Sequence, residues 1–356
     1  MPLWTSHDVR WLVRARPEHY QAMTESINEI DPATIPGIES RAPWHHPWRA
    51  WKAIFGRIWV MVGYHNLPLM AAGVAFYAFL SFVPLLGAVV MTYGLVADPA
   101  TVAAHMNTII DLVPADAARL IQDQLTTIAS TATSKAGLAL IVALGFSIYG
   151  AMRASGAIIQ ALGVIYEEED GRSIFRFYSL SARITLVAVA AGVVGLLAAG
   201  LLAWLGNAVT VLGQIGVVVI QALTWIVAAG IASWAFGFVY RFGPDRADAR
   251  WQWLTVGSIA ATILWLVATL LFGVYVSHFA NYNATYGSLG AVVVLMMWLW
   301  VSAYAILIGA EINAEAERQT GVDSTTGPPR PRGERGATVA DALPSRKQRK
   351  PRRDKY

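Results

Sequence analysis

Long apolar runs separated by short polar segments dominate the chain, and six of them are long enough to cross a membrane. About 20 apolar residues in an α-helix span the roughly 30 Å hydrocarbon core of a bilayer. The pattern therefore predicts an all-α integral membrane protein with six transmembrane helices. The expected spans are Leu69–Ala97, Ala136–Tyr166, Ile184–Gly206, Ile215–Tyr240, Leu254–Ser277 and Leu289–Ala310.

Amphipathic segments accompany these spans. Trp48–Tyr64 carries aromatic and aliphatic residues at helical spacing and its basic residues elsewhere, a pattern typical of a helix in the membrane interface. Residues 98–135 show two short amphipathic patterns separated by Pro114. Because such short helices are not stable alone in water, we expect them to form a small helical cap on the outer face.

The chain divides into three parts. Residues 1–47 are polar and predict a cytoplasmic N-terminal region, and residues 48–320 form the six-helix membrane domain with its outer cap at 98–135. Residues 321–356 hold ten Lys and Arg against four Asp and Glu and are rich in Pro and Gly. This composition predicts a disordered basic cytoplasmic tail, either solvated or attracted to anionic lipid headgroups.

The distribution of basic residues predicts the orientation. With six spans and both termini in the cytoplasm, 24 Lys and Arg lie inside and two lie outside. This asymmetry is the one that membrane proteins show, with basic loops retained on the cytoplasmic side. We expect a multi-pass protein of the bacterial inner (plasma) membrane, with the N-terminus in and the C-terminus in.

Composition excludes several chemistries. The chain has no cysteine, which removes disulfides, thiolate nucleophiles and Cys-ligated metals. Its net charge of +4 comes from the tail, so a specific nucleic-acid partner is not expected. We predict no catalytic residue, no cofactor and no metal, because the histidines are scattered without ligand spacing. They are His7, His19, His45, His46, His65, His105 and His278.

The final helical hairpin supplies most candidate residues. Asn283, Tyr286 and Gly287 lie in its outer turn, where a glycine can take positive φ and the polar side chains can satisfy backbone groups. At its other end the last apolar run closes with Glu311, Asn313 and Glu315. These ends predict either a clamp that holds the fold or a substrate gate.

Two further candidates interrupt apolar runs. Arg153 lies inside the second run, either at the cytoplasmic interface or at an internal site, with Glu311 as its expected partner. Glu311 and Glu315 share a helix face and are expected to meet Arg153 or Arg241. Pro84 is expected to kink the first span, for packing or to leave carbonyls facing a substrate cavity.

Two weaker patterns concern loops and partners. Four adjacent acidic residues, 167–170, are expected to form a solvated loop. Ala191, Gly195 and Ala199 form a face of small residues that suits close helix contact, either within the chain or in a homo-oligomer.

Four stretches of the chain resemble the YihY/virulence factor BrkB family of bacterial inner-membrane proteins. They are AAGVAFYAFLSFVPLL (71–86), ALGVIYEEEDGR (161–172), YRFGPDR (240–246) and YNATYGSLGAVVVLMMWLWVSAYAILIGAEINAE (282–315). The resemblance implies a six-helix membrane protein concerned with envelope lipids or lipopolysaccharide precursors. It also implies that the ribonuclease name once given to the family is a mis-assignment.

These observations lead to one hypothesis and two alternatives. We expect transport or flipping of an envelope lipid or a lipid-linked precursor, with membrane lipids as partners, because intramembrane charges are few. The first alternative is a non-transporting scaffold for envelope-assembly proteins, and the second is a channel.

Overall fold

All six predicted runs are helices in the computed structural model, which describes residues 34–96, 136–208, 213–278 and 288–344. Each helix begins within three residues of its run, except α7, which starts ten residues before the expected Ile184, and α11 continues eight residues beyond the expected Ala310. The helices are α3 (Leu67–Val96), α6 (Ala136–Ile165), α7 (Ile174–Ala208), α8 (Gly213–Phe242), α9 (Trp251–His278) and α11 (Ser288–Arg318). The protein is an all-α integral membrane protein.

Five described helices are long and apolar enough to cross a membrane on their own, from α6 through α11. The first span is a bent pair, in which α2 (Trp48–Tyr64) joins α3 at an angle of 61°. His65 and Asn66 form the break, and Asn66 has a φ of 51°. The predicted six spans are therefore met if this pair counts as one crossing.

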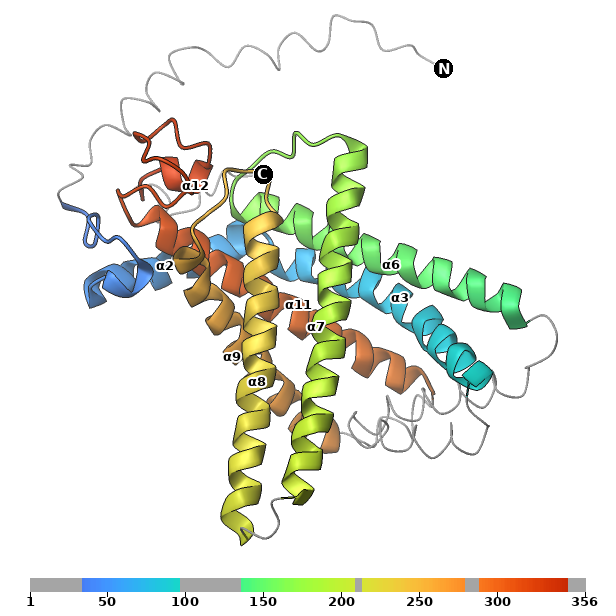
Figure 1. Ribbon diagram of the computed structural model, residues 1–356. Coiled ribbons are helices and arrows are strands. Elements are labelled where there is room, and N and C mark those ends of the chain that lie inside the picture. The colour runs from blue at the N-terminus through green and yellow to red at the C-terminus, as the bar shows by residue number, and fades with distance from the viewer. Residues whose placement is uncertain (1–33, 97–135, 209–212, 279–287, 345–356) are drawn as a thin grey trace, which may run out of the picture.

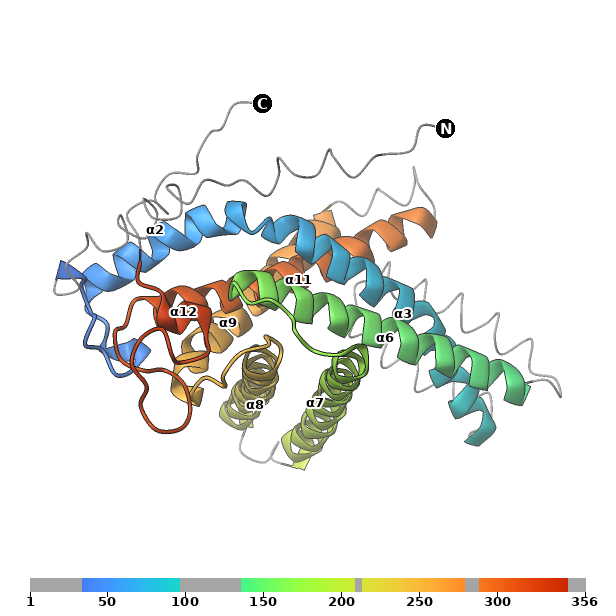
Figure 2. The same cartoon turned by 90° about the horizontal axis from the view of Figure 1, so that it is seen from above.

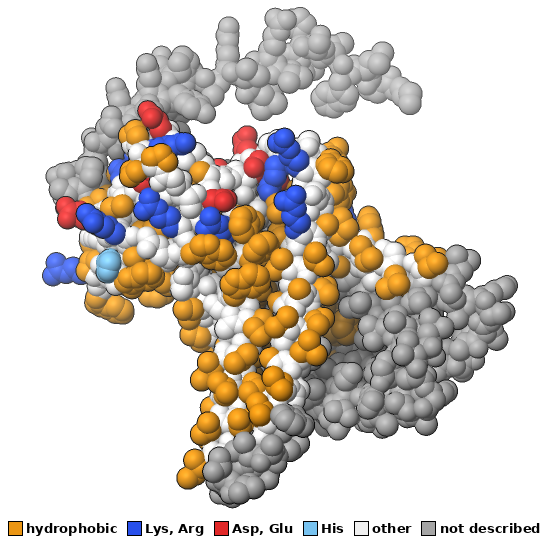
Figure 3. Space-filling view, viewed as in Figure 1, with side chains coloured by type: hydrophobic (Ala, Val, Ile, Leu, Met, Phe, Trp, Pro, Cys, Tyr) orange, Lys and Arg blue, Asp and Glu red, His pale blue; other side chains and the backbone are white. Residues whose placement is uncertain are grey.

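The helices are arranged as neighbouring pairs that diverge from one end. Helix α3 runs beside α6, α9 beside α11, and α7 beside α8 (Figures 1 and 2). The α7–α8 pair and the α3–α6 pair leave the shared end in different directions, and α9 and α11 lie between them. Charged side chains gather over this shared end, whereas α7 and α8 present apolar side chains along their length (Figure 3).

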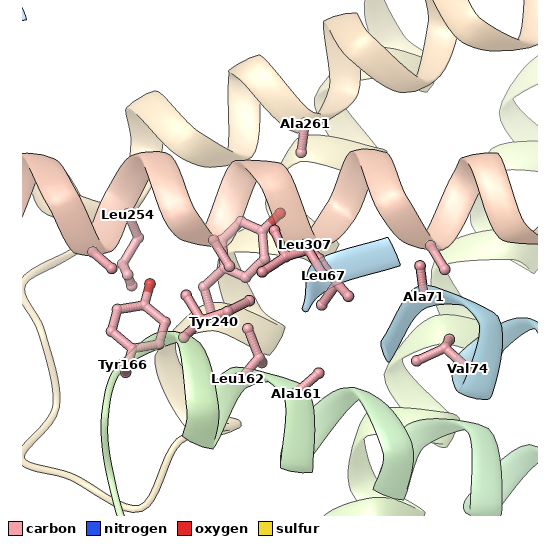
Figure 4. Close-up of a cluster of buried hydrophobic side chains, with 14 of the residues drawn as sticks. Leu67, Ala71, Val74, Ala161, Leu162, Tyr166, Tyr240, Leu254, Ala261 and Leu307 are labelled. Atoms are coloured by element: carbon pink, nitrogen blue, oxygen red, sulfur yellow. The ribbon is translucent and has the colours of Figure 1, made fainter. Parts of the chain in front are cut away.

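The main hydrophobic core lies at this same end. Four side chains are at most 1% exposed and point toward one another: Leu162 of α6, Tyr166 directly after α6, Tyr240 of α8 and Leu307 of α11 (Figure 4). The Tyr240 hydroxyl donates to the carbonyl of Ile306 at 2.6 Å. Large side chains from α6, α8 and α11 therefore meet where these helices converge.

Helices α9 and α11 cross at two glycines. A Cβ on Gly309 would lie 2.5 Å from the Cβ of Ala261 and 2.6 Å from the Tyr240 hydroxyl. A Cβ on Gly257 would overlap the Gly309 carbonyl oxygen and the Asn313 side chain. Only glycine allows the two backbones to approach this closely.

Helix α2 has the predicted bounds, but its basic residue Arg57 lies on the buried side of the helix. Its buried residues include Ile54, Arg57 and Met61, whereas Trp59 is 85% exposed. Arg57 is buried because it faces α11, and the aromatic side of the helix faces outward. The helix therefore packs on the bundle through a stripe that contains one arginine.

The prediction of a disordered tail is wrong for residues 321–344. This segment, which we call the C-terminal strap, folds back over the charged end and includes α12 (Thr338–Asp341). Val339 joins the main core, and Arg335 donates to the carbonyls of Gly321 at 2.7 Å and Ala340 at 2.8 Å. The strap is ordered because side chains satisfy its backbone groups and because Val339 is buried in the main core. Residues 345–356 lie outside the described part.

Other expectations also fall outside the described residues. They concern the cap at 98–135, the outer turn with Asn283, Tyr286 and Gly287, and residues 1–33. The small-residue face of α7 is described at Gly195, where an added Cβ would meet no described atom within 4 Å.

The close crossing of α9 and α11 predicts that Gly257→Ala destabilises the protein by about 1–3 kcal/mol, because the added methyl overlaps α11. Gly273→Ala is the matched control on α9, since a Cβ there meets nothing within 4 Å. Melting of both variants in detergent tests this expectation. Equal melting temperatures for the two would contradict the crossing.

Candidate functional site

Polar side chains at the C-terminal end of α11 are buried rather than solvated. The predicted residues Glu311, Asn313 and Glu315 are at most 1% exposed, and so are the next polar residues, Glu317 and Arg318. They meet side chains from α2, the α2–α3 break, the end of α6 and the α8–α9 loop. We call this group the polar foot: Arg57, His65, Glu167, Arg246, Glu311, Asn313, Glu315, Glu317 and Arg318.

One face of α11 carries three charged residues of the foot. Glu311 lies 3.0 Å from Nδ1 of His65. The Glu315 carboxylate accepts from Nε of Arg57, whose Nη2 also donates to the Glu315 carbonyl at 3.1 Å. Arg318 lies 3.2 Å from Glu315 and donates to Glu167 at 2.8 Å. Two carboxylates on one helix face thus bind Arg57 of α2 and His65 of the α2–α3 break.

The expected partners of Glu311 and Glu315 are therefore wrong. Arg153 donates instead to the hydroxyl of Tyr77 on α3 at 3.1 Å, and its guanidinium lies 5.0 Å from the Tyr77 ring centre. It lies 12 residues before the end of α6, about 18 Å along the helix axis. Arg241 donates to the carbonyl of Ala249 at 2.9 Å. Neither arginine reaches the end of α11.

Asn313 joins α11 to α9. Its Oδ1 accepts from the amide of Gly257 at 2.7 Å, and its Nδ2 donates to the carbonyl of Leu254 at 3.1 Å. Both bonds are buried, and both depend on the close approach at Gly257. The asparagine therefore holds the relative position of the two helices along their axes.

Glu317 joins α11 to the α8–α9 loop. It accepts from Nη2 of Arg246 at 2.9 Å and from the hydroxyl of Ser324 at 2.6 Å. The Arg246 guanidinium lies 4.3 Å from the ring centre of Tyr166. Burial by itself lowers the pKa of Arg246, but the neighbouring groups, with Glu317 first among them, together outweigh burial and the pKa is raised. Burial raises the pKa of Tyr166 far above its usual range. Both groups therefore keep their protons at any physiological pH.

The acidic segment 167–170 is part of this structure and not only a solvated loop. Glu167 binds Arg318, and Glu168 accepts from the amide of Thr338 at 2.6 Å and from its hydroxyl at 3.1 Å. Partial burial raises the pKa of Glu168 despite these two bonds. The segment thus attaches the C-terminal strap to the end of α6.

Sequence reasoning found three members of the foot and missed the others. Arg57 and His65 could have been found from the sequence, because each is a polar residue within or next to an apolar helical stripe. Arg246 and Glu317 gave none, because their pairing depends on how a loop folds back. Pro84 lies inside α3, which continues through it to Val96, and it is half-buried.

A second feature lies farther along the spans, between α8 and α9. It is an apolar groove of about 460 Å³, open on one side. Small and apolar residues line it, together with two tryptophans. The lining includes Gly230, Ser233, Trp234, Gly237, Trp251, Thr255, Ser258 and Thr262.

The hydroxyl groups of this groove are bonded within the helices. Thr255 donates to the carbonyl of Trp251 at 2.9 Å, and Thr262 donates to that of Ser258 at 2.9 Å. Ser233 donates to Ser258 across the helix pair at 3.2 Å. These groups offer few free donors, so the wall suits an apolar ligand better than a polar solute.

A cation lies beside one end of the groove. The Arg241 guanidinium lies 5.1 Å from the ring centre of Trp251, which lines the groove. Its nearest carboxylate contact is Asp248 at 3.5 Å, and that side chain is 43% exposed. The groove therefore combines an apolar wall with a positive charge at the end that carries the polar foot.

Within the described ranges, no group of three or more His, Asp or Glu side chains is arranged to hold a metal ion.

The burial of the foot predicts that Arg57→Gln destabilises the protein by about 3 kcal/mol, because Glu315 then keeps a buried charge with one cation fewer. Denaturant unfolding in detergent measures the change. Arg49→Gln, an exposed arginine on the same helix, is the matched control and should have little effect.

The double variant Arg57→Gln and Glu315→Gln tests whether the two residues act as a pair. It should be less destabilised than the sum of the single variants, because no charge is then left unpaired. Additive losses would show that the two side chains are energetically independent.

Three comparisons place the chain among known proteins. Residues 58–334 match the family model described as virulence factor BrkB. A UPF0761 membrane protein of Tolumonas auensis is 26% identical over 75% of this chain and 85% of its own length. The ribonuclease-like protein YfkH of Bacillus subtilis is 32% identical over 47% of this chain.

Coverage of these relatives varies. The match spans 62% of YfkH, and 33% of the UPF0761 membrane protein RC1_0578 of Rhodospirillum centenum, which is 28% identical over 43% of this chain. No solved structure matches the chain. The family match covers most of the spans and the whole polar foot except Arg57. This multi-pass membrane protein belongs to the virulence factor BrkB family.

Proposed function

We propose that the protein binds an envelope lipid, or a lipid-linked precursor, and moves it between the leaflets of the bacterial inner membrane. The groove between α8 and α9 carries this proposal. Both helices are spans, so a groove that opens sideways from them opens toward acyl chains. Its volume of about 460 Å³ falls in the range of about 300–1,000 Å³ that ligand sites occupy.

The chemistry of the groove supports a lipid over a polar solute. Its hydroxyls donate to their own helix or, for Ser233, to Ser258 on the facing helix, so hydrocarbon can lie against them without leaving a donor unpaired. Arg241 beside Trp251 favours an anionic headgroup at one end. An amphipathic ligand would place its acyl chains against the apolar wall and its headgroup beside Arg241. Lipid movement of this kind involves no enzymatic step.

We infer that both termini face the cytoplasm. The end of α11 contacts the α2–α3 break, the α6–α7 loop, the α8–α9 loop and the strap. Charged side chains gather at this end of the bundle (Figure 3). These segments hold six basic residues, Arg172, Arg246, Arg250, Arg330, Arg332 and Arg335, and α2 adds Arg49, Lys52 and Arg57. Their common position supports an orientation with that end inside.

Filling the groove should abolish lipid movement. Gly230 lines the groove, and an added Cβ there meets nothing within 4 Å, so Gly230→Phe places a ring in the groove without overlap at its base. We expect loss of translocation of a fluorescent anionic phospholipid in reconstituted vesicles, with the melting temperature unchanged. Gly192→Phe is the matched control, since Gly192 is also exposed but lies on α7 outside the groove.

Two outcomes of this assay contradict the proposal. Equal translocation by the wild type and Gly230→Phe would remove the groove from the lipid path. A folded wild type that moves no lipid above protein-free vesicles would favour the scaffold, and conductance of ions in the same vesicles would favour a channel.

The orientation has its own test, helped by the absence of native cysteine. We expect an impermeant thiol reagent added to whole cells to label Ser130→Cys. It should label the exposed positions Glu169→Cys and Pro328→Cys only after the membrane is opened. Labelling of Glu169→Cys in intact cells would reverse the orientation.

A further inference from the structure

His65 and Glu311 form a buried pair at the break between α2 and α3. Nδ1 of His65 lies 3.0 Å from Oε2 of Glu311, and the two side chains are 3% and 0% exposed. The second polar atom of each, Nε2 of His65 and Oε1 of Glu311, is buried without a hydrogen-bond partner among the described residues. Each group is therefore held by the other and by little else.

The charges of the polar foot leave this pair uncompensated. Its three arginines each have a carboxylate of their own: Arg57 has Glu315, Arg246 has Glu317 and Arg318 has Glu167. Four carboxylates face three guanidiniums, so the foot carries one excess negative charge, and Glu311 has only His65 to balance it. A buried carboxylate without a counter-charge is strongly unfavourable.

Other groups around Glu311 do not supply the missing charge. Glu315 and Arg318, on its own helix, are engaged with Arg57 and Glu167. Tyr166, at the end of α6, is neutral, and Arg246 of the α8–α9 loop is bound to Glu317. Helix α9 has no Asp, Glu, Lys or Arg in its whole length.

We infer that His65 and Glu311 together bind one exchangeable proton and that its release loosens the α2–α3 break. With the proton present the foot is neutral, whichever of the two residues holds it. Without it, an uncompensated carboxylate is buried beside a 61° bend whose only linker residues are His65 and Asn66. The proton moves between this pair and water, and no other group is consumed.

The His65–Glu311 pair lies at the break between α2 and α3, where a change in its charge can alter the angle between the two helices. Asn66 has positive φ, so the break has a conformation that few residues other than Asn and Gly adopt. Helix α2 is held to α11 by Arg57, and α3 begins directly after the break. A proton-dependent contact here can therefore change the angle between α2 and the rest of the first span.

Stability as a function of pH tests this inference. In an unfolded chain, carboxylates and imidazoles have pKa values of about 4.3 and about 6.5, so the pair is empty above neutral pH. If the folded pair keeps one proton, the folded state binds more protons than the unfolded state, and stability falls as pH rises. Above about pH 7, the folded-to-unfolded ratio of the wild type should therefore fall about tenfold per pH unit for as long as the folded pair keeps its proton.

Variants assign this loss to the pair. Glu311→Gln removes the buried negative charge and should flatten the alkaline loss, whereas His65→Gln should keep it because Glu311 then holds the proton alone. Glu169→Gln, an exposed acid in the α6–α7 loop, is the control and should match the wild type. The same pH dependence in the wild type and Glu311→Gln would overturn the inference.

A second measurement needs no variant. Unfolding the wild type at about pH 7.5 in weak buffer should release one proton to an indicator dye, because the unfolded pair cannot hold it. Release of no proton would overturn the inference even if Glu311→Gln does not fold. Neither readout involves lipid, so these experiments test the proton site independently of the proposed lipid groove.

Discussion

The burial of charged side chains at the end of α11 is the constraint on which the rest of the structure depends. Glu311, Glu315 and Glu317 are each at most 1% exposed, and a carboxylate in such a place is tolerated only with a partner. The partners come from the α2–α3 break, α2 and the α8–α9 loop, while Arg318 of α11 reaches the end of α6. Segments separated by more than 200 residues must therefore meet at one point.

This convergence has a geometric consequence for the spans. The glycine crossing of α9 and α11 and the buried tyrosines hold the helices together at the charged end, and away from it the helix pairs diverge (Figures 1 and 2). The α8–α9 groove lies along the diverging part, and its Trp251 end adjoins the fixed part. The proton proposal rests on the buried polar foot at the charged end, and the lipid proposal rests on the α8–α9 groove beside it.

The sequence predicted the helices well because apolar length and spacing are local properties. The bounds of α2 and the starts of α6 and α11 follow directly from where apolar residues begin. The periodicity also placed Glu311 and Glu315 on one face of α11. It could not name their partners, because Arg57 and His65 are brought there by the angle between α2 and α3, which no local pattern encodes.

The order of the C-terminal strap could not be predicted from local sequence either. Its composition is that of a disordered segment, and few of its residues are apolar. It is ordered because Arg335 and Asp323 bond its backbone, and because Thr338 meets Glu168. Composition counts apolar residues, but it does not register hydrogen bonds between side chains and a distant backbone.

An experimental density map of the full chain in anionic lipid nanodiscs tests the central claim most directly. The account predicts that Arg57, His65 and Arg246 surround the end of α11 and that a rod of acyl-chain density lies between α8 and α9 against Trp251. A map in which these three side chains face solvent, or in which a protein helix fills the groove, would contradict it.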